Sequence, residues 1–329
     1  SKYFVLHSMV ATTLSICLGS YLILIYTFSL ILNLVVPYVL YKGKFLSSKH
    51  NPIYILSFAN MCGNVPMTAL YAFYFGPSCV LQDFLFPEGK DDFFTGFIAF
   101  LIHSHWYQDL FVNDALSFNR LITVVYPKAE FLFSRKITVR LVLFLYLFAY
   151  SLSCFDYYYL PCCKFYLYYG SFSYAALDTG YNMVNIFVNT PLNFITSSFA
   201  VINYIIIYIF VYISNRKMNH VIDKSTQKVR KTQEIKYAVQ FALCTVCGIA
   251  TWVSTRIFIY TGVPKGPLYI ILSTFEVIHV SANAIVFLVL NKEVREQFKC
   301  HILGRKSKKN TSVSVLPSGI TGRTPTKVA

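Results

Sequence analysis

The stretch LGSYLILIYTFSLILNLVVPYVL, residues 18–40, carries no charged side chain along its whole length. A helix needs about 20 predominantly apolar residues to cross the hydrocarbon core of a bilayer. The stretch therefore predicts a membrane-spanning helix, which we place at residues 14–41. Pro37 falls inside this helix, where neighbouring helices can satisfy the carbonyl group that a proline leaves free.

Six further segments of the chain pass the same length test. The chain is 56% hydrophobic and 13% charged, whereas about a quarter of the residues in a soluble domain are charged. These values predict an all-α membrane protein, a seven-helix bundle formed by residues 1–300. A soluble bundle of very apolar helices is the alternative. We place the six remaining spans at residues 51–75, 93–126, 137–160, 184–213, 235–261 and 268–290.

The lysines and arginines are distributed unevenly between the two sides of the predicted bundle. Of the 29 basic residues, 24 lie on the side of the carboxyl-terminal tail, whereas the opposite loop LQDFLFPEGKDD, residues 81–92, is acidic. Cytoplasmic loops of membrane proteins carry the basic excess, so we expect the amino terminus outside and the tail in the cytosol. The net charge of +15 then reflects topology and attraction to anionic membrane lipid. A nucleic-acid partner is not needed.

The chain ends in a basic tail, residues 301–329, that is rich in Ser, Thr, Gly and Lys. It has too little apolar content to fold, so we predict a disordered cytosolic segment. Cys300 lies just before this tail, after the amphipathic stretch NKEVREQFK at residues 291–299. Palmitoylation of Cys300 would hold that stretch on the membrane. A free cytosolic thiol is the equal alternative.

A single cation, Arg120, lies near the inner end of the third span, in SFNRLITVVYP at residues 117–127. An arginine at the end of a membrane helix can extend its charged group to the interface at little cost. Taken alone, Arg120 is therefore interpreted as a membrane anchor. Residues in other predicted spans, at characteristic spacings along the sequence, favour a second interpretation.

The inner ends of two spans resemble those of the rhodopsin-like G-protein-coupled receptors. In that family the third helix ends Asp-Arg-Tyr, with a proline seven residues after the arginine. Here Asn119, Arg120 and Leu121 occupy the three places, and Pro127 keeps the spacing. The stretch NAIVFLVLNKEVREQF, residues 283–298, resembles the family's Asn-Pro-x-x-Tyr motif followed by an amphipathic eighth helix. In that stretch Asn283 is kept, whereas Ala284 and Phe287 replace the proline and the tyrosine.

Three more positions match the spacing of the same family. Asn33 matches the first-helix asparagine, and Asn60, 27 residues later, lies where the family usually has an aspartate. Trp252 matches the sixth-helix tryptophan, eighteen residues after Glu234. Within the family, the chain is most similar to the nematode serpentine chemoreceptors of class x. That similarity rests on SFNRLITVVYP, FLFSRK, NPIYILSFANMCGN and FDYYYLPCCKFYLYYG.

The resemblance implies a chemosensory receptor of the plasma membrane, in a sensory cilium for this class, that binds a small molecule and activates a heterotrimeric G protein. It implies that Arg120 pairs with Glu234 at rest and is freed when helix six swings outward. The lost aspartate beside Arg120 implies appreciable basal activity, because Glu234 alone would hold the arginine. The residues expected to form this switch and the G-protein contact are Asn119, Arg120, Glu234, Asn283 and Phe287.

Four ionisable residues within the predicted spans are singled out: Asp109, Asp114, Arg256 and Glu276. Unpaired at mid-bilayer, each would cost about 3 kcal/mol, so they are expected to face inward. By resemblance, Asp109 lies beside the family's sodium pocket, and an ion or proton site would consist of Asn60, Asp109, His279 and Asn283. A protonated Asp109 hydrogen-bonded to Asn60 is the alternative. For Asp114 no family role is expected.

Arg256 and Glu276 fall in the outer half of the bundle, where the resemblance places ligands. They are expected to pair with each other across helices six and seven, to anchor a polar ligand, or to do both. We therefore predict a ligand pocket lined by His103, Trp106, Trp252, Arg256 and Glu276. His103 and His105 are two residues apart, which puts them on different helix faces, so no metal site is expected.

The cysteines predict one bridge. Cys79, Cys162 and Cys163 lie in the predicted outer loops, where an oxidising environment favours a disulfide, and the choice of partners is open. Cys244 and Cys247 form CTVC inside an apolar span, where small buried packing residues are expected.

No metalloprotease, nucleophile-elbow or phosphate-loop motif is present in the sequence, so neither an enzyme nor a cofactor is predicted. The alternative function is a polytopic transporter or channel subunit in which Asp109, Asp114 and Glu276 carry ions or protons.

Overall fold

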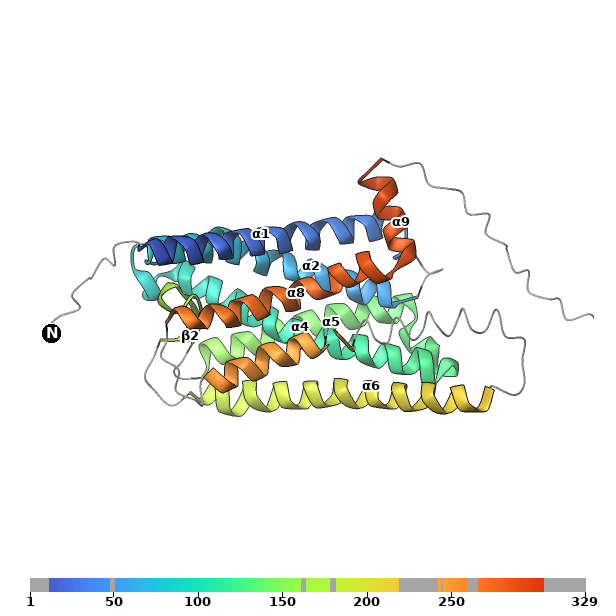
Figure 1. Cartoon of the computed structure of the whole chain (residues 1–329). Helices are drawn as coiled ribbons and strands as arrows, with labels where there is room; N and C mark the ends of the chain where they lie inside the picture. The colour runs from blue at the N-terminus through green and yellow to red at the C-terminus, as the bar shows by residue number, and fades with distance from the viewer. Residues whose placement is uncertain are drawn as a thin grey trace, which may run out of the picture.

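The computed structural model describes residues 12–47, 51–160, 164–177, 182–218, 242–243, 245–258 and 266–304. Within these ranges, long helices run side by side along a common axis, and the short α9 turns across one end of the bundle (Figure 1). We call that end the inner end and the opposite end the outer end, following the distribution of basic residues. The long elements are α1 (Thr13–Lys42), α2 (Ile53–Leu70), α4 (Phe93–Val125), α5 (Arg135–Tyr158), α6 (Thr190–Met218) and α8 (Ile270–Leu290).

The helix boundaries follow from local sequence chemistry. Thr12 caps α1, because its hydroxyl oxygen accepts a hydrogen bond from the Ser15 amide (3.2 Å). Asp92 caps α4 by accepting from the Phe94 amide (2.8 Å). At its other end α4 stops at Val125, since the ring of Pro127 disfavours helical geometry at the residue before it.

The second span is longer than the sequence predicts. The chain continues from α2 into the π-helical turn η1 (Tyr71–Phe75) and the short α3 (Gly76–Leu81). Together these three elements form one apolar segment, Ile53–Leu81. The prediction ended this span at residue 75, before Pro77. In a regular α-helix the ring of Pro77 would clash with the carbonyl of Phe73. The structure has the π-helical turn η1 at that place, in which the backbone hydrogen bonds join residues five apart instead of four.

The segment between α5 and α6 contains a β-hairpin that the all-α prediction did not include. Strand β1 (Phe165–Tyr168) pairs antiparallel with β2 (Ser173–Ala176), with Phe165 opposite Ala176 and Tyr168 opposite Ser173. The 3₁₀ turn η4 (Tyr169–Ser171) joins the strands. The hairpin lies at the outer end of the bundle (Figure 1).

Hydrogen bonds tie this hairpin to three helices. The Tyr157 hydroxyl of α5 donates to the Phe165 carbonyl (3.0 Å), and the Ser273 hydroxyl of α8 donates to the Phe172 carbonyl (2.8 Å). The Tyr174 hydroxyl lies 2.6 Å from that of Thr255, in helix six. These hydrogen bonds hold the hairpin in place over the outer end of the bundle, and we refer to the hairpin as the roof.

Helix six is described at residues 242–243 and 245–258, all of them helical. The described chain also contains three short 3₁₀ turns. They are η2 (Gly89–Asp91), η3 (Pro127–Phe133) and η6 (Pro267–Tyr269). The π-helical η5 (Val184–Asn189) leads directly into α6, and α9 (Lys292–His301) follows α8 after Asn291. Asn291 caps α9, because its side chain accepts from the Val294 amide (3.1 Å).

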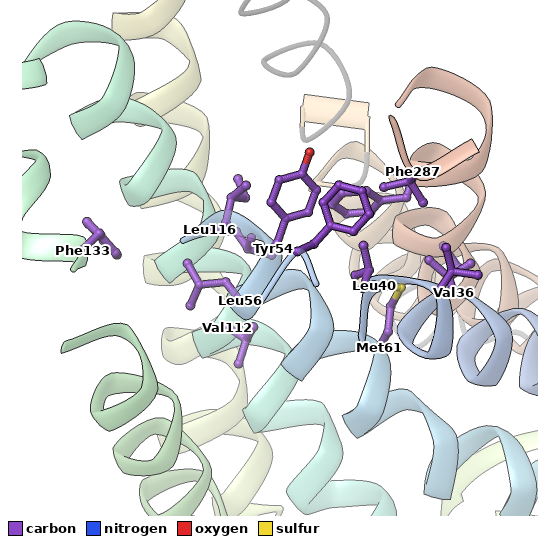
Figure 2. Close-up of a cluster of buried hydrophobic side chains, with 14 of the residues drawn as sticks. Val36, Leu40, Tyr54, Leu56, Met61, Val112, Leu116, Phe133 and Phe287 are labelled. Carbon is purple, nitrogen blue, oxygen red and sulfur yellow. The ribbon is translucent and has the colours of Figure 1, made fainter. Parts of the chain in front are cut away.

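The buried apolar side chains form two main clusters. The inner cluster joins α1, α2, α4, α8 and α9, and Figure 2 shows Tyr54 and Phe287 close together within it. The rings of Tyr54 and Phe287 are 5.9 Å apart. Val294 of α9 is fully buried in the same cluster, which fixes the amphipathic helix predicted after the last span. The outer cluster contains Tyr26 and Tyr71, stacked at 4.3 Å.

Five apolar segments of the described chain are long enough to cross a membrane: Thr13–Lys42, Ile53–Leu81, Arg135–Tyr158, Val184–Ser214 and Pro267–Leu290. They correspond to the predicted spans one, two, four, five and seven. The 33-residue α4 corresponds to the third and carries Asp109, Asp114 and Arg120. Many side chains on the outward faces are exposed and apolar, among them Leu24 and Phe28 of α1, as expected for helices that face lipid.

Candidate functional site

A cavity lies under the hairpin in the outer half of the bundle. It has a volume of about 750 Å³, which includes the space open to solvent at its mouth. Its lining includes several aromatic side chains, among them Tyr71 from η1, Trp106 from α4, Trp252 from helix six, and Phe165 and Tyr174 from the roof. Sites for small molecules are typically concave and largely apolar, with a few polar groups that fix orientation. We refer to this space as the outer cavity.

All five residues predicted to form a ligand pocket line the outer cavity. They come from three helices and from positions up to 173 residues apart in the chain, and they are His103, Trp106, Trp252, Arg256 and Glu276. The structure therefore brings the predicted set together in one place. Binding of a ligand by these residues stays a prediction.

Arg256 and Glu276 do not pair with each other, contrary to one expectation. The Arg256 Nη1 donates to the side-chain oxygen of Asn185 (2.7 Å), and its guanidinium lies over the Trp252 ring at 5.9 Å. Neither carboxylate oxygen of Glu276 has a hydrogen-bond partner in the described part of the chain. Arg256 is turned toward η5, which leads into α6, whereas Glu276 lies on α8.

Tyr174 of the roof is within electrostatic reach of both charges. Burial raises the pKa of its hydroxyl, and the Glu276 carboxylate raises that pKa further. The hydrogen bond to Thr255 and the charge of Arg256 lower the same pKa. Burial is the largest of these effects, so the pKa of the Tyr174 hydroxyl lies above its usual range.

A buried acid that the sequence analysis did not single out lies beside the cavity. Asp156, on α5, is 3% exposed. It accepts a short hydrogen bond from the Tyr107 hydroxyl, and His103 Nε2 lies 3.4 Å from the same carboxylate. His103 is also 2.9 Å from the Tyr107 hydroxyl, which lies 2.7 Å from the Asn189 side-chain oxygen. His103 is thus held in a network that joins α4, α5 and η5.

A second cavity of about 440 Å³ lies deeper in the bundle and shares Trp106, Asn193 and Trp252 with the outer cavity. Asp109, Asn113, Asp114 and His279 also line it. We refer to it as the middle cavity. Its wall carries both acids of α4, which confirms the expectation that Asp114 faces inward.

Asp109 is the hub of a buried polar network. One carboxylate oxygen accepts from the Asn60 amide (2.7 Å), and the other lies 2.6 Å from His279 Nε2 and accepts from the Asn113 amide (2.9 Å). The Asn283 amide in turn donates to the Asn60 oxygen (2.6 Å). The four residues predicted for an ion or proton site therefore form one connected set, and occupation of that set by an ion stays a prediction.

A second branch of polar groups connects α1 to the same level. The Asn33 and Asn64 amides both donate to the Val280 carbonyl of α8 (3.2 and 2.9 Å). The Asn64 side-chain oxygen lies 2.9 Å from His105 Nε2. His105 is thus a buried structural residue. In the part of the chain that the structure describes, no group of three His, Cys, Asp or Glu side chains has the geometry of a metal site.

The residues predicted for the inner switch are buried at the other end of α4 and α8. Arg120 is 2% exposed and Asn119 is 1% exposed, so Arg120 does not extend to the membrane surface as an anchor would. Phe287 is 1% exposed in the inner cluster. Glu234, the predicted partner of Arg120, lies outside the described residues.

The structure corrects the prediction for Cys79. This residue lies in α3, is fully buried in the outer cluster and carries a free thiol, because the second span extends past residue 75. Cys162, Cys163 and Cys244 lie outside the described residues, so a bridge that uses Cys162 or Cys163 stays a prediction. Cys300 has a free, half-buried thiol at the end of α9. Its palmitoylation is a prediction as well. The tail beyond residue 304 is also outside the described part of the chain.

Comparison with solved structures identifies the fold. Squid rhodopsin matches with a TM-score of 0.70 at 13% sequence identity, over 88% of this chain and 85% of the squid protein. At that identity the likeness shows the fold, which is the seven-transmembrane bundle of a rhodopsin-like receptor. A search of curated protein sequences found no match.

The family follows from the sequence itself. The model of the serpentine type 7TM GPCR chemoreceptor Srx family matches residues 23–291, which is most of the chain. The protein belongs to this family, whose members are multi-pass membrane receptors and not enzymes. The resemblance drawn from SFNRLITVVYP and the other motifs is thereby confirmed.

Proposed function

We propose that this protein is a chemosensory receptor of the plasma membrane that binds a small molecule in the outer cavity and activates a heterotrimeric G protein at its inner end. The observation that supports this proposal most strongly is the alignment of three features along α4. His103 and Trp106 line the outer cavity, Asp109 lines the middle cavity, and Arg120 is buried at the inner end. One rigid helix thus connects the ligand site to the switch.

The two cavities supply a physical route between these ends. Trp106 and Trp252 line both of them, so a ligand that moves either indole changes the wall of the middle cavity. Asp109 and His279 lie in that wall and continue through Asn60 to Asn283. Binding would shift an existing equilibrium between inactive and active bundles, with Arg120 and Glu234 paired only in the inactive one.

The test is guanine-nucleotide exchange in membranes that carry equal surface amounts of wild type, Arg120→Ala and Glu234→Ala, with several classes of G protein. We expect basal exchange from the wild type. Glu234→Ala should raise it at least several-fold, because Arg120 is buried and the loss of one partner of a buried ion pair costs more than an exposed pair contributes, which is about 1 kcal/mol or less. Arg120→Ala should reduce exchange to the level of empty membranes.

A flux measurement distinguishes the receptor proposal from the transporter or channel alternative. The middle cavity holds two acids, Asp109 and Asp114, which is the arrangement a proton or ion pathway would need. In proteoliposomes, that alternative predicts an ion or proton flux that is lost in Asp109→Asn and Asp114→Asn. Such a flux, together with exchange equal to empty membranes for all three receptor preparations, would contradict the receptor proposal.

A further inference from the structure

Glu276 is a buried acid whose polar atoms are unsatisfied. It is 1% exposed, it lines the outer cavity, and neither of its carboxylate oxygens has a hydrogen-bond partner in the described part of the chain. A buried carboxyl group without partners is costly whether it is charged or neutral, because both forms lose the hydrogen bonds that water provides. Such a group facing a cavity indicates that its partner comes from outside the chain.

The basic side chains around the two cavities are hydrogen-bonded to other groups. Arg256 donates to Asn185, and His279 lies against Asp109. The two remaining basic side chains, His103 and His105, contact Tyr107 and Asn64 respectively. Glu276 is thus the acid among the described residues that line the outer cavity, and its carboxyl group has no hydrogen-bond partner in that part of the chain.

The rest of the wall suits an organic cation. Aromatic rings attract a cation over their faces, and several rings around one carboxylate are the usual surroundings of a bound ammonium group. Six aromatic side chains line the outer cavity with Glu276, namely Tyr71, Trp106, Phe165, Tyr166, Tyr174 and Trp252.

From this arrangement we infer that the ligand of the outer cavity is a small organic monocation, whose protonated or quaternary ammonium group binds the Glu276 carboxylate and whose apolar body packs on the aromatic wall. The inference rests on the proposed ligand site and adds the chemical class of the ligand. Arg256 lines the same cavity, and its charge disfavours a second cationic group on the ligand.

The chain contains its own fluorescent reporters of this binding. It has only two tryptophans, and both Trp106 and Trp252 line the outer cavity. Their fluorescence in the purified receptor, reconstituted in lipid nanodiscs, therefore reports occupation without any G protein. The probes are tetramethylammonium, choline, phenethylamine and octylamine, with 2-phenylethanol as the neutral counterpart of phenethylamine and sodium chloride as the inorganic control.

We expect a saturable fluorescence change with at least one ammonium probe below about 10 mM, a weak Kd typical of a fragment. Glu276→Gln should weaken that probe at least tenfold, about 1.4 kcal/mol, whereas Glu276→Asp should keep part of the affinity. Glu88→Gln, which removes an exposed acid of the outer loop, should bind as the wild type does. This control separates Glu276 from general attraction of cations to the outer surface.

A second measurement tests whether the carboxyl group of Glu276 stabilises the receptor when no probe is bound. Glu276→Met replaces the carboxyl group by an apolar one of similar size, so it should raise the melting temperature of the probe-free receptor. A lower melting temperature would mean that Glu276 has a structural partner, and the inference would fall.

Three binding results would also overturn it: no saturation with any of the four ammonium probes, equal affinity for phenethylamine and its neutral counterpart, or an unchanged affinity in Glu276→Gln. Binding of the neutral probe alone would leave the outer cavity as the ligand site and remove only the ligand class. Nucleotide exchange, measured separately, decides whether the protein is a coupled receptor.

Discussion

Asp109 connects three helices through hydrogen bonds to its two carboxylate oxygens. Asn60 belongs to α2, Asn113 to α4 itself and His279 to α8. Asp109 is 4% exposed, so the network has little access to solvent. Removal of one member of a buried, hydrogen-bonded charge pair leaves the others unsatisfied, and this loss is larger than the net contribution of the pair itself.

Asp109→Ala should therefore lower the free energy of unfolding by about 2–5 kcal/mol. Asp109→Asn should cost less, since an amide oxygen can still accept a hydrogen bond from Asn60. The measurement is the melting temperature of the purified receptor. Asp91→Ala, at an exposed acid of the outer loop, is the control and should stay within about 0.5 kcal/mol of wild type. Equal melting temperatures for Asp109→Ala and wild type would refute the network.

For single residues, the sequence predicted which side chains face the interior of the bundle more accurately than it predicted which groups those side chains contact. Asn60, Asp109, His279 and Asn283 form one set as expected, because helical spacing places them at one level of the bundle. Arg256 and Glu276 share a cavity but do not pair. Which group a side chain contacts depends on its rotamer, and a single sequence does not specify the rotamer. Asp156 falls inside the predicted span 137–160 but was not singled out there as a buried acid.

At the scale of elements, close approach between helices decides the packing of α1. A Cβ atom at Gly19 would lie 2.6 Å from the Val80 Cγ2 and 2.7 Å from the Val80 backbone nitrogen. Backbone cannot move aside as a flexible side chain can, so α1 and α3 pack directly on this glycine. The contact also places Cys79 in the outer cluster.

Gly19→Ala should destabilise the receptor by about 1–3 kcal/mol, because overpacking forces α1 away from α3. Gly96→Ala is the matched control, since a Cβ at Gly96 would meet nothing within 4 Å and a helical alanine is favoured over glycine by about 1 kcal/mol. The two substitutions should therefore shift the melting temperature in opposite directions. A rise for Gly19→Ala would show that α1 does not rest on α3.

The elements that the sequence predicted less well are those whose ends depend on tertiary contacts. Apolar length placed α1, α4 and α8 within two residues of their observed bounds, because the bilayer thickness fixes the length of a span. The second span runs six residues further, through a π-helical turn that no propensity predicts. The hairpin was missed because its short strands are held by Tyr157, Ser273 and Thr255, all on other elements.

At the scale of the whole molecule, the account requires that the outer cavity and the inner surface influence each other. Coupling between two sites is reciprocal, so a partner that binds the inner end must change the outer end. The two tryptophans lie between the outer and the middle cavity and report on that change. Sequence alone predicted the two ends by resemblance, whereas the two adjoining cavities follow only from the packed structure.

The most direct test is ¹⁹F NMR of the receptor labelled with 5-fluorotryptophan, which gives two resonances, from Trp106 and Trp252. Unlabelled G protein adds no signal of its own. We predict that nucleotide-free heterotrimeric G protein shifts the Trp252 resonance, that excess non-hydrolysable GTP analogue reverses the shift, and that Arg120→Ala does not show it. If both resonances stay unchanged with every class of G protein, the inner end is not coupled to the outer cavity and the receptor account is wrong.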